Sequence, residues 1–200
     1  MIERYTRPEM GHLWSIQNEW QTILNVEIAA CEAMAELGEI PAAAVQNIKA
    51  NAKFDVARIN EIEKTTDHDI IAFLTNLEEN VGEDSKYIHK GLTSSDVKDT
   101  AYCVMMRDAA AIILDDLRAF REVLRRRAEE FRHTPCIGRT HGIHAEPMTF
   151  GLKLLLWSAE IERDIERLMR AKEIVSVGKL SGAVGTYSNI DPRIEELTCK

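Results

Sequence analysis

A decapeptide with two histidines and two glycines has the residue types of an acid–base site. Residues 138–147 read GRTHGIHAEP. An imidazole such as that of His141 can give or take a proton at neutral pH. The guanidinium of Arg139 can hold a carboxylate through two parallel hydrogen bonds. Because Gly142 has no side chain, it lets the backbone approach a ligand closely. The segment therefore predicts a catalytic loop.

Two other interpretations of this decapeptide compete with catalysis. His141, His144 and Glu146 offer three possible metal ligands, but an HxxH pair suits zinc only on a helix and with further ligands. Gly142 lies between the two histidines, and the sequence has no second Cys/His cluster. An ordinary turn between two helices is the other alternative, and it leaves the crowding of polar residues unexplained. We expect no metal here.

A second histidine lies between two acidic residues. His68 is flanked by Asp67 and Asp69 in the stretch TTDHD, an arrangement that suits acid–base work. The simpler interpretation is a helix start, with Asp67 or Thr66 capping a helix that begins at Ile70. The residues alone favour the cap.

Hydroxyl side chains mark the expected start of the longest helix. The stretch HKGLTSSD, residues 89–96, places Thr93 and Ser94 at this start. Helix N-termini attract anions through free N–H groups and the helix dipole. Plain capping is the alternative, since Thr93 and Asp96 have the spacing of a capping box. Three hydroxyls in a row favour a carboxylate or phosphate ligand.

Two further segments carry weaker signals. The glycine-rich stretch at 178–192 suits an anion cradle, but no strand precedes it, so it is not a nucleotide-binding fingerprint. A simple connector explains it equally well. Near the N-terminus, Arg4, Tyr5 and Arg7 suit a phosphate, although chain termini are often loose.

Apolar spacing predicts that helices position all these segments. Trp20, Leu24 and Ile28 recur at helical steps. No proline or glycine occurs from Thr93 to Arg132, which predicts one helix of roughly 38 residues and ~57 Å. We expect GRTHGIHAEP to be a loop, Pro147 to begin the next helix, and no strand anywhere. Such long helices need other helices to cover their apolar faces.

Composition narrows the class of protein. The chain has 200 residues, 45% of them apolar, and a net charge of −8. An acidic chain repels nucleic acid and anionic membranes, and no apolar run is long enough to span a bilayer. The N-terminus has no signal-peptide core. No cysteine lies within four residues of another, which indicates reduced thiols and a cytoplasmic protein.

Five stretches together resemble the fumarase/aspartase superfamily, in that family's order and spacing. THGIHAEP is similar to its adenylosuccinate lyase branch. The resemblance implies an all-α fold with a small N-terminal helical domain over 1–92. Residues 93–200 are then the first long helices of an elongated bundle. The stretches are RYTRPEMG, TTDHDIIAF, HKGLTSSDVKDTA, GRTHGIHAEPMTFGLK and GKLSGAVGTYSNIDP.

The resemblance also implies a reaction and residue roles. Fumarate would be eliminated from adenylosuccinate, leaving AMP, and from the succinocarboxamide ribotide of purine biosynthesis, with no cofactor. His141 resembles the general acid, and His68 the histidine that assists at the succinyl end. Asp67 departs from some relatives, which have a basic residue there. The residues similar to substrate-binding ones are Arg4, Tyr5, Asp67, Asp69, His89, Thr93 and Ser94.

Family members are more than twice as long and assemble as homotetramers whose sites combine three subunits. Their loop of the form SSxMPxKxNP, which carries the general base, is absent here. We therefore expect residues 1–200 alone to be inactive. The alternatives are another fumarate-releasing lyase of the superfamily and a non-catalytic helical assembly fragment.

Overall fold

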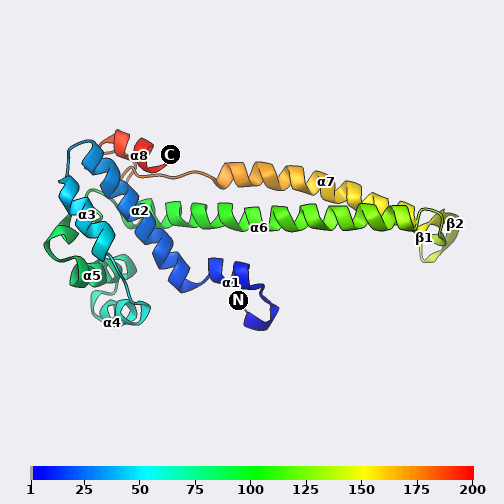
Figure 1. Ribbon diagram of the computed structural model, residues 1–200, viewed down its shortest axis with the longest axis horizontal. Coiled ribbons are helices and arrows are strands. Elements are labelled where there is room, and N and C mark those ends of the chain that lie inside the picture. The colour runs from blue at the N-terminus through cyan, green and yellow to red at the C-terminus, as the bar shows by residue number, and fades with distance from the viewer. Residues whose placement is uncertain (1) are drawn as a thin grey trace. The chain divides into compact units, whose positions relative to one another are not determined.

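The computed structural model describes residues 2–200 and is mostly helical (Figure 1). The predicted all-α class is confirmed. The chain divides into two compact units. The first unit comprises the residues up to Met106 together with Ser176–Lys200, and the second unit is Arg107–Val175. This division differs from the predicted domains 1–92 and 93–200, which stay a prediction.

Most helices of the first unit are short. The break at TTDHD separates two helices, and Gly38, with a φ of +76°, follows the end of another. The elements are η1 (Glu3–Tyr5), α1 (Pro8–Leu13), α2 (Ile16–Glu36), α3 (Ala42–Asn51), α4 (Val56–Thr66), α5 (Asp69–Val81), η2 (Gly82–Tyr87), the start of α6 (Ser94–Glu130) and α8 (Pro192–Thr198).

An aromatic stack lies in the core of the first unit. The rings of Trp20 and Phe73 stack with centroids 4.8 Å apart, and Phe54 meets Phe73 edge-on at 5.9 Å. Leu180 and Ile194 are fully buried in the same core, and α8 packs on α2 (Figure 1). The segment after residue 176 is therefore an integral part of the first unit.

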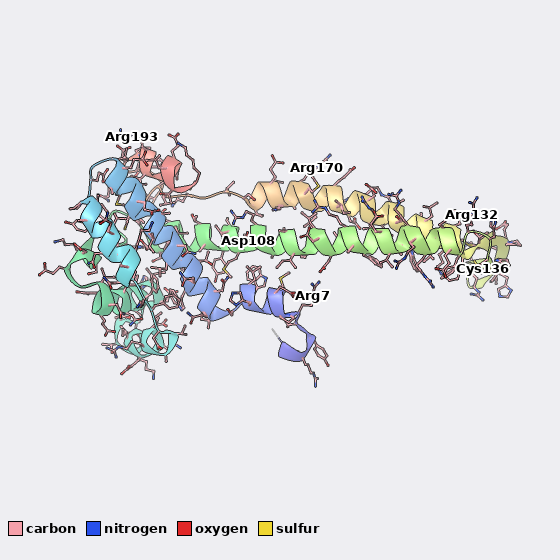
Figure 2. All side chains as sticks on the ribbon, in the orientation of Figure 1. Arg7, Asp108, Arg132, Cys136, Arg170 and Arg193 are labelled. Carbon is pink, nitrogen blue, oxygen red and sulfur yellow. The ribbon has the colours of Figure 1, made fainter. Side chains whose placement is uncertain are left out.

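The second unit contains the rest of α6, a β-hairpin and α7 (Phe150–Val175). The strands β1 (Pro135–Thr140) and β2 (Ile143–Thr149) pair antiparallel. Arg132 and Cys136 in Figure 2 mark where α6 gives way to the hairpin. The predicted single helix after residue 93 is confirmed, since α6 has 37 residues.

The expectation that the chain has no strand, with a loop at 138–147, is wrong. The hairpin turns at His141 and Gly142, whose φ angles of +51° and +76° are those of a two-residue type I′ turn. Pro147 lies within β2 and does not begin a helix, which starts at Phe150. A two-stranded ribbon consists of edge strands, and these tolerate proline.

Neither a membrane span nor a metal cluster is found between residues 2 and 200. No helix there is long and apolar enough to cross a bilayer. No group of three or more His, Cys, Asp or Glu side chains in this range could hold a metal ion. All four cysteines are free.

Candidate functional site

His141 occupies the tip of the hairpin in the second unit. Its backbone is left-handed, with Gly142 as the second turn residue, and its side chain is exposed. Arg139 pairs with His144 across the strands, next to a register shift between Ile137 and Arg139. The turn thus presents the imidazole outward on a short, hydrogen-bonded support.

His68 forms the junction between α4 and α5 in the first unit. Its Nδ1 accepts a hydrogen bond from the Ile71 N–H at 3.3 Å, so His68 itself is the N-cap of α5. The predicted capping by Asp67 or Thr66 is therefore wrong. Asp67 ends α4 in a left-handed conformation, and the Thr66 hydroxyl donates to the His68 carbonyl. With Nδ1 accepting, the neutral ring carries its proton on Nε2.

Asp69 connects this junction to α6. Its Oδ2 lies 2.5 Å from the Lys98 Nζ, and its Oδ1 accepts from the Ile70 N–H at 2.7 Å. Burial raises the pKa of Asp69, but the hydrogen bonds from Lys98 and Ile70 outweigh it and hold the pKa below its ordinary value. The same pair raises the pKa of Lys98.

Lys98 also belongs to this site, although its residue type and position did not predict it. It lies four residues after Ser94, so both occupy one face of α6. The ion pair with Asp69 therefore holds the His68 junction beside the helix face that begins at Ser94. The i, i+4 spacing was visible in the sequence, but the pairing with Asp69 across 29 residues was not.

His89 is held by a buried carboxylate of α2. The Nδ1 of His89 lies 2.5 Å from the Glu27 Oε1, and its backbone N–H donates to the Oε2 at 3.0 Å. Glu27 is fully buried, and His89 has a φ of +63°. Glu27 was also not predicted to matter, although an acidic residue between Leu24 and Ile28 on an apolar face was a usable signal.

Thr93 and Ser94 are at the start of α6, as expected. The Thr93 N–H donates to the Asp96 Oδ2 at 2.9 Å, which is one half of the predicted capping box. Both residues are half-buried. The helix start thus presents hydroxyl groups while Asp96 faces inward.

The remaining predicted residues lie at the N-terminus. The Arg4 guanidinium lies over the ring of Tyr5, 4.7 Å from its centroid, and Tyr5 is 73% exposed. Both belong to the first unit, as do His68, His89 and Thr93. His141 belongs to the second unit, so the two predicted catalytic histidines are divided between the units.

Comparisons with known proteins agree along the whole chain. A protein-family model described as lyase matches residues 3–200. Two relatives named adenylosuccinate lyase, from a Synechocystis species and from Bacillus subtilis, are 54% and 52% identical over all 200 residues. These 200 residues correspond to 46% of each relative, so the chain spans about half the length of the curated relatives it matches.

Solved structures give the same picture of the fold. A fumarate lyase from a Mesorhizobium species matches 95% of this chain with 46% of its own, at a TM-score of 0.89 and 31% identity. A β-carboxy-cis,cis-muconate cycloisomerase from Acinetobacter calcoaceticus matches 96% of this chain with 48% of its own, at a TM-score of 0.90 and 28% identity.

Proposed function

The chain belongs to this lyase family, and on that premise we propose that it is the N-terminal part of an adenylosuccinate lyase. The parent enzyme releases fumarate from adenylosuccinate to leave AMP, and from the succinocarboxamide ribotide of purine biosynthesis. The observation that carries the proposal is a sequence identity of 54% and 52%, over all 200 residues, to two relatives named adenylosuccinate lyase.

The proposed reaction is a β-elimination. A general base, which family members carry in the SSxMPxKxNP loop, takes the proton from the carbon beside a carboxylate. The electron pair of that C–H bond forms the C=C bond of fumarate as the C–N bond to the purine amine breaks. The departing nitrogen needs a proton, and His141 supplies it as the general acid. The position of His141 at an exposed, glycine-flanked turn supports this role, because a ligand can reach the ring.

His68 assists at the succinyl end, where negative charge develops. Its Nδ1 hydrogen bond to α5 supports this role, because the bond fixes the ring and leaves Nε2 as the donor. Thr93 and Ser94 bind a substrate carboxylate, as the N-terminus of a 37-residue helix favours. In this proposal Asp67 and Asp69 belong to the substrate-contacting stretch, although Lys98 already pairs with Asp69.

Arg4, Tyr5 and His89 contact the nucleotide, with His89 at its phosphate. Arg4 contributes a fixed positive charge, and the exposed ring of Tyr5 offers a face to a base or ribose. The clamp of Glu27 on His89 supports a defined ring orientation.

The parent protein works in the cytoplasm as a homotetramer, without a metal or organic cofactor. Large apolar side chains exposed along α7 support an assembly, because such surfaces mark protein contacts. Since the sequence of residues 1–200 contains no SSxMPxKxNP loop, we expect this chain alone to be inactive.

Fumarate release is the direct test of this proposal. Residues 1–200 are assayed with adenylosuccinate alone, and then mixed with the Bacillus subtilis relative whose histidine matching His141 is replaced by alanine. We expect turnover only in the mixture, where this chain supplies the acid. The control is residues 1–200 with His141→Ala, which rescues nothing, whereas His144→Ala rescues normally. Turnover by residues 1–200 alone would contradict the predicted inactivity.

A second lyase reaction is the nearest alternative. The structural similarity to a fumarate lyase and to a cycloisomerase favours a broader range of chemistry for this fold. The complete polypeptide that contains residues 1–200 separates the two, when assayed with adenylosuccinate and with argininosuccinate. Turnover of argininosuccinate alone would reject the proposed substrate. Turnover of neither would favour a non-catalytic helical assembly.

A further inference from the structure

Asp96 is a fully buried carboxylate that binds two segments far apart in the sequence. Its Oδ2 accepts from the N–H groups of Thr93 at 2.9 Å and Gly182 at 3.0 Å. Its Oδ1 accepts from the Lys179 Nζ at 2.7 Å and the Ser181 N–H at 3.1 Å. Burying a charge is costly unless it is fully paired. Here each carboxylate oxygen accepts hydrogen bonds from two donors.

The donors belong to the start of α6 and to the glycine-rich stretch that follows α7. Thr93 comes directly before α6, whereas Lys179, Ser181 and Gly182 lie over 80 residues later. Burial raises the pKa of Asp96, but the bonds from Lys179, Thr93 and Ser181 outweigh it and keep the carboxyl ionised at neutral pH.

Other contacts bring the same two segments together. A Cβ added to Gly91 would lie 2.3 Å from the Asn189 carbonyl oxygen, so only glycine fits at this crossing. The Thr100 hydroxyl bonds to the backbone of Lys179. Leu180 is buried, and its N–H donates to Glu195. By contrast, residues 183–186 at the crest of the stretch are exposed.

We propose that Asp96 is a positioning residue for substrate binding, because it holds the glycine-rich stretch 178–190 in register with Thr93 and Ser94. The inference rests on the proposed function, in which Thr93 and Ser94 bind a substrate carboxylate. The exposed crest then forms a second wall beside that carboxylate. Gly185 in this crest and Gly182 just before it both have positive φ, and Gly185 allows close backbone approach to the ligand.

The test uses Asp96→Asn in the complete polypeptide that contains residues 1–200. An amide keeps the shape but removes the charge and turns an NH2 group toward N–H donors. We expect KM for adenylosuccinate to rise about tenfold or more, with a smaller fall in kcat, because binding groups lose their register. Amide hydrogen exchange should accelerate at Ser181 and Gly182, while α2 and α5 keep their protection.

Asp99→Asn is the matched control. It makes the same chemical change three residues later on α6, at an exposed position. We expect KM and exchange within about twofold of the unmodified protein. Lys179→Gln guards against a variant that fails to fold, because the Lys179 side chain is 44% exposed. It should raise KM and exchange in the same direction, by less.

The outcomes distinguish a role of Asp96 in substrate binding from a role in stability alone. A variant that only loses folded protein shows a lower apparent kcat at unchanged KM, and that result in both Asp96→Asn and Lys179→Gln would overturn the inference. Faster exchange at residues 181–182 with unchanged KM and kcat would overturn it too, as would unchanged exchange. An inactive unmodified polypeptide would instead reject the proposed function, and exchange would still report whether Asp96 holds the stretch.

Discussion

The two units bury their apolar residues very differently. The first unit has a continuous core of large side chains, among them Trp20, Phe73 and Leu77. The second unit has a small cluster around Leu124, Ala128 and Leu154. This unit leaves the following large apolar side chains exposed: Ile113, Phe120, Val123, Ile143, Leu152, Leu155, Leu156, Trp157, Met169 and Ile174.

This difference in packing determines which contacts hold each predicted site residue in place. His68, His89 and Thr93 are held by partners within the first unit, such as the buried carboxylates of Glu27 and Asp96. His141 stands on a two-stranded hairpin, and such a ribbon is only marginally stable by itself. Under the proposed function, the apolar faces of α6 and α7 gain their cover from further helices.

Two matched phenylalanine-to-alanine substitutions, one in each unit, should show the largest difference in stability between the units. Phe73→Ala should cost about 3–5 kcal/mol of unfolding free energy, because it removes a fully buried ring stacked on Trp20. Phe150→Ala should cost about 1 kcal/mol, since that ring is only partly buried. Urea unfolding, followed by amide hydrogen exchange in each unit, measures the loss of unfolding free energy in each variant. Equal losses would contradict the difference in core packing between the units.

Glu27→Gln should cost about 1–3 kcal/mol of unfolding free energy in the first unit. The change weakens two hydrogen bonds to His89 inside a buried site. Glu36→Gln, on the exposed side of the same helix, is the control and should stay within about 0.5 kcal/mol. Urea denaturation measures both variants. No difference between them would show that the clamp on His89 contributes nothing to stability.

Leu156→Gln tests the exposed apolar face of α7. Leu156 is 63% exposed in the second unit. If this face is an interface in the complete polypeptide, the change should weaken self-association about tenfold, because burying a leucine side chain contributes ~1.5–3 kcal/mol. Sedimentation velocity across a concentration series measures this. Arg163→Gln on the same helix is the control, and an equal effect there would argue against the apolar face.

Low pH should destabilise the first unit, and this is the smallest of the expected effects. The folded-state pKa values of Asp96 and Asp69 lie below their ordinary values. As the pH falls below ~5 toward the ordinary Asp pKa of about 3.9, these carboxyls bind protons in the unfolded chain before they do so in the folded protein. The stabilisation that the two carboxylates contribute is therefore present above this pH range, and it is lost as the pH falls to the lower folded-state pKa values.

Asp96→Asn should narrow the loss of stability between pH 6 and pH 3, because one of these carboxyls is gone. Urea midpoints at both pH values measure the loss, with Asp99→Asn as the control. An unchanged difference in Asp96→Asn would show that Asp96 does not contribute to acid unfolding.

Local rules in the sequence determined most of the helical pattern. The absence of proline and glycine predicted α6, and the spacing of Trp20, Leu24 and Ile28 predicted α2. A helix start at TTDHD was also predicted, although His68 and not Asp67 or Thr66 caps the helix. Each of these depends on neighbouring residues alone, so periodicity and caps suffice to find it.

The hairpin and the partners of the site residues could not be found from the sequence pattern. GRTHGIHAEP lacks an alternating apolar pattern, and its strands form because a type I′ turn at His141 and Gly142 brings two edges into register. Glu27 with His89, Lys98 with Asp69, and Asp96 with Lys179 pair across 29 to 83 residues. Sequence spacing shows which residues share a helix face, but ion pairs between distant segments exist only once the core has placed those segments side by side.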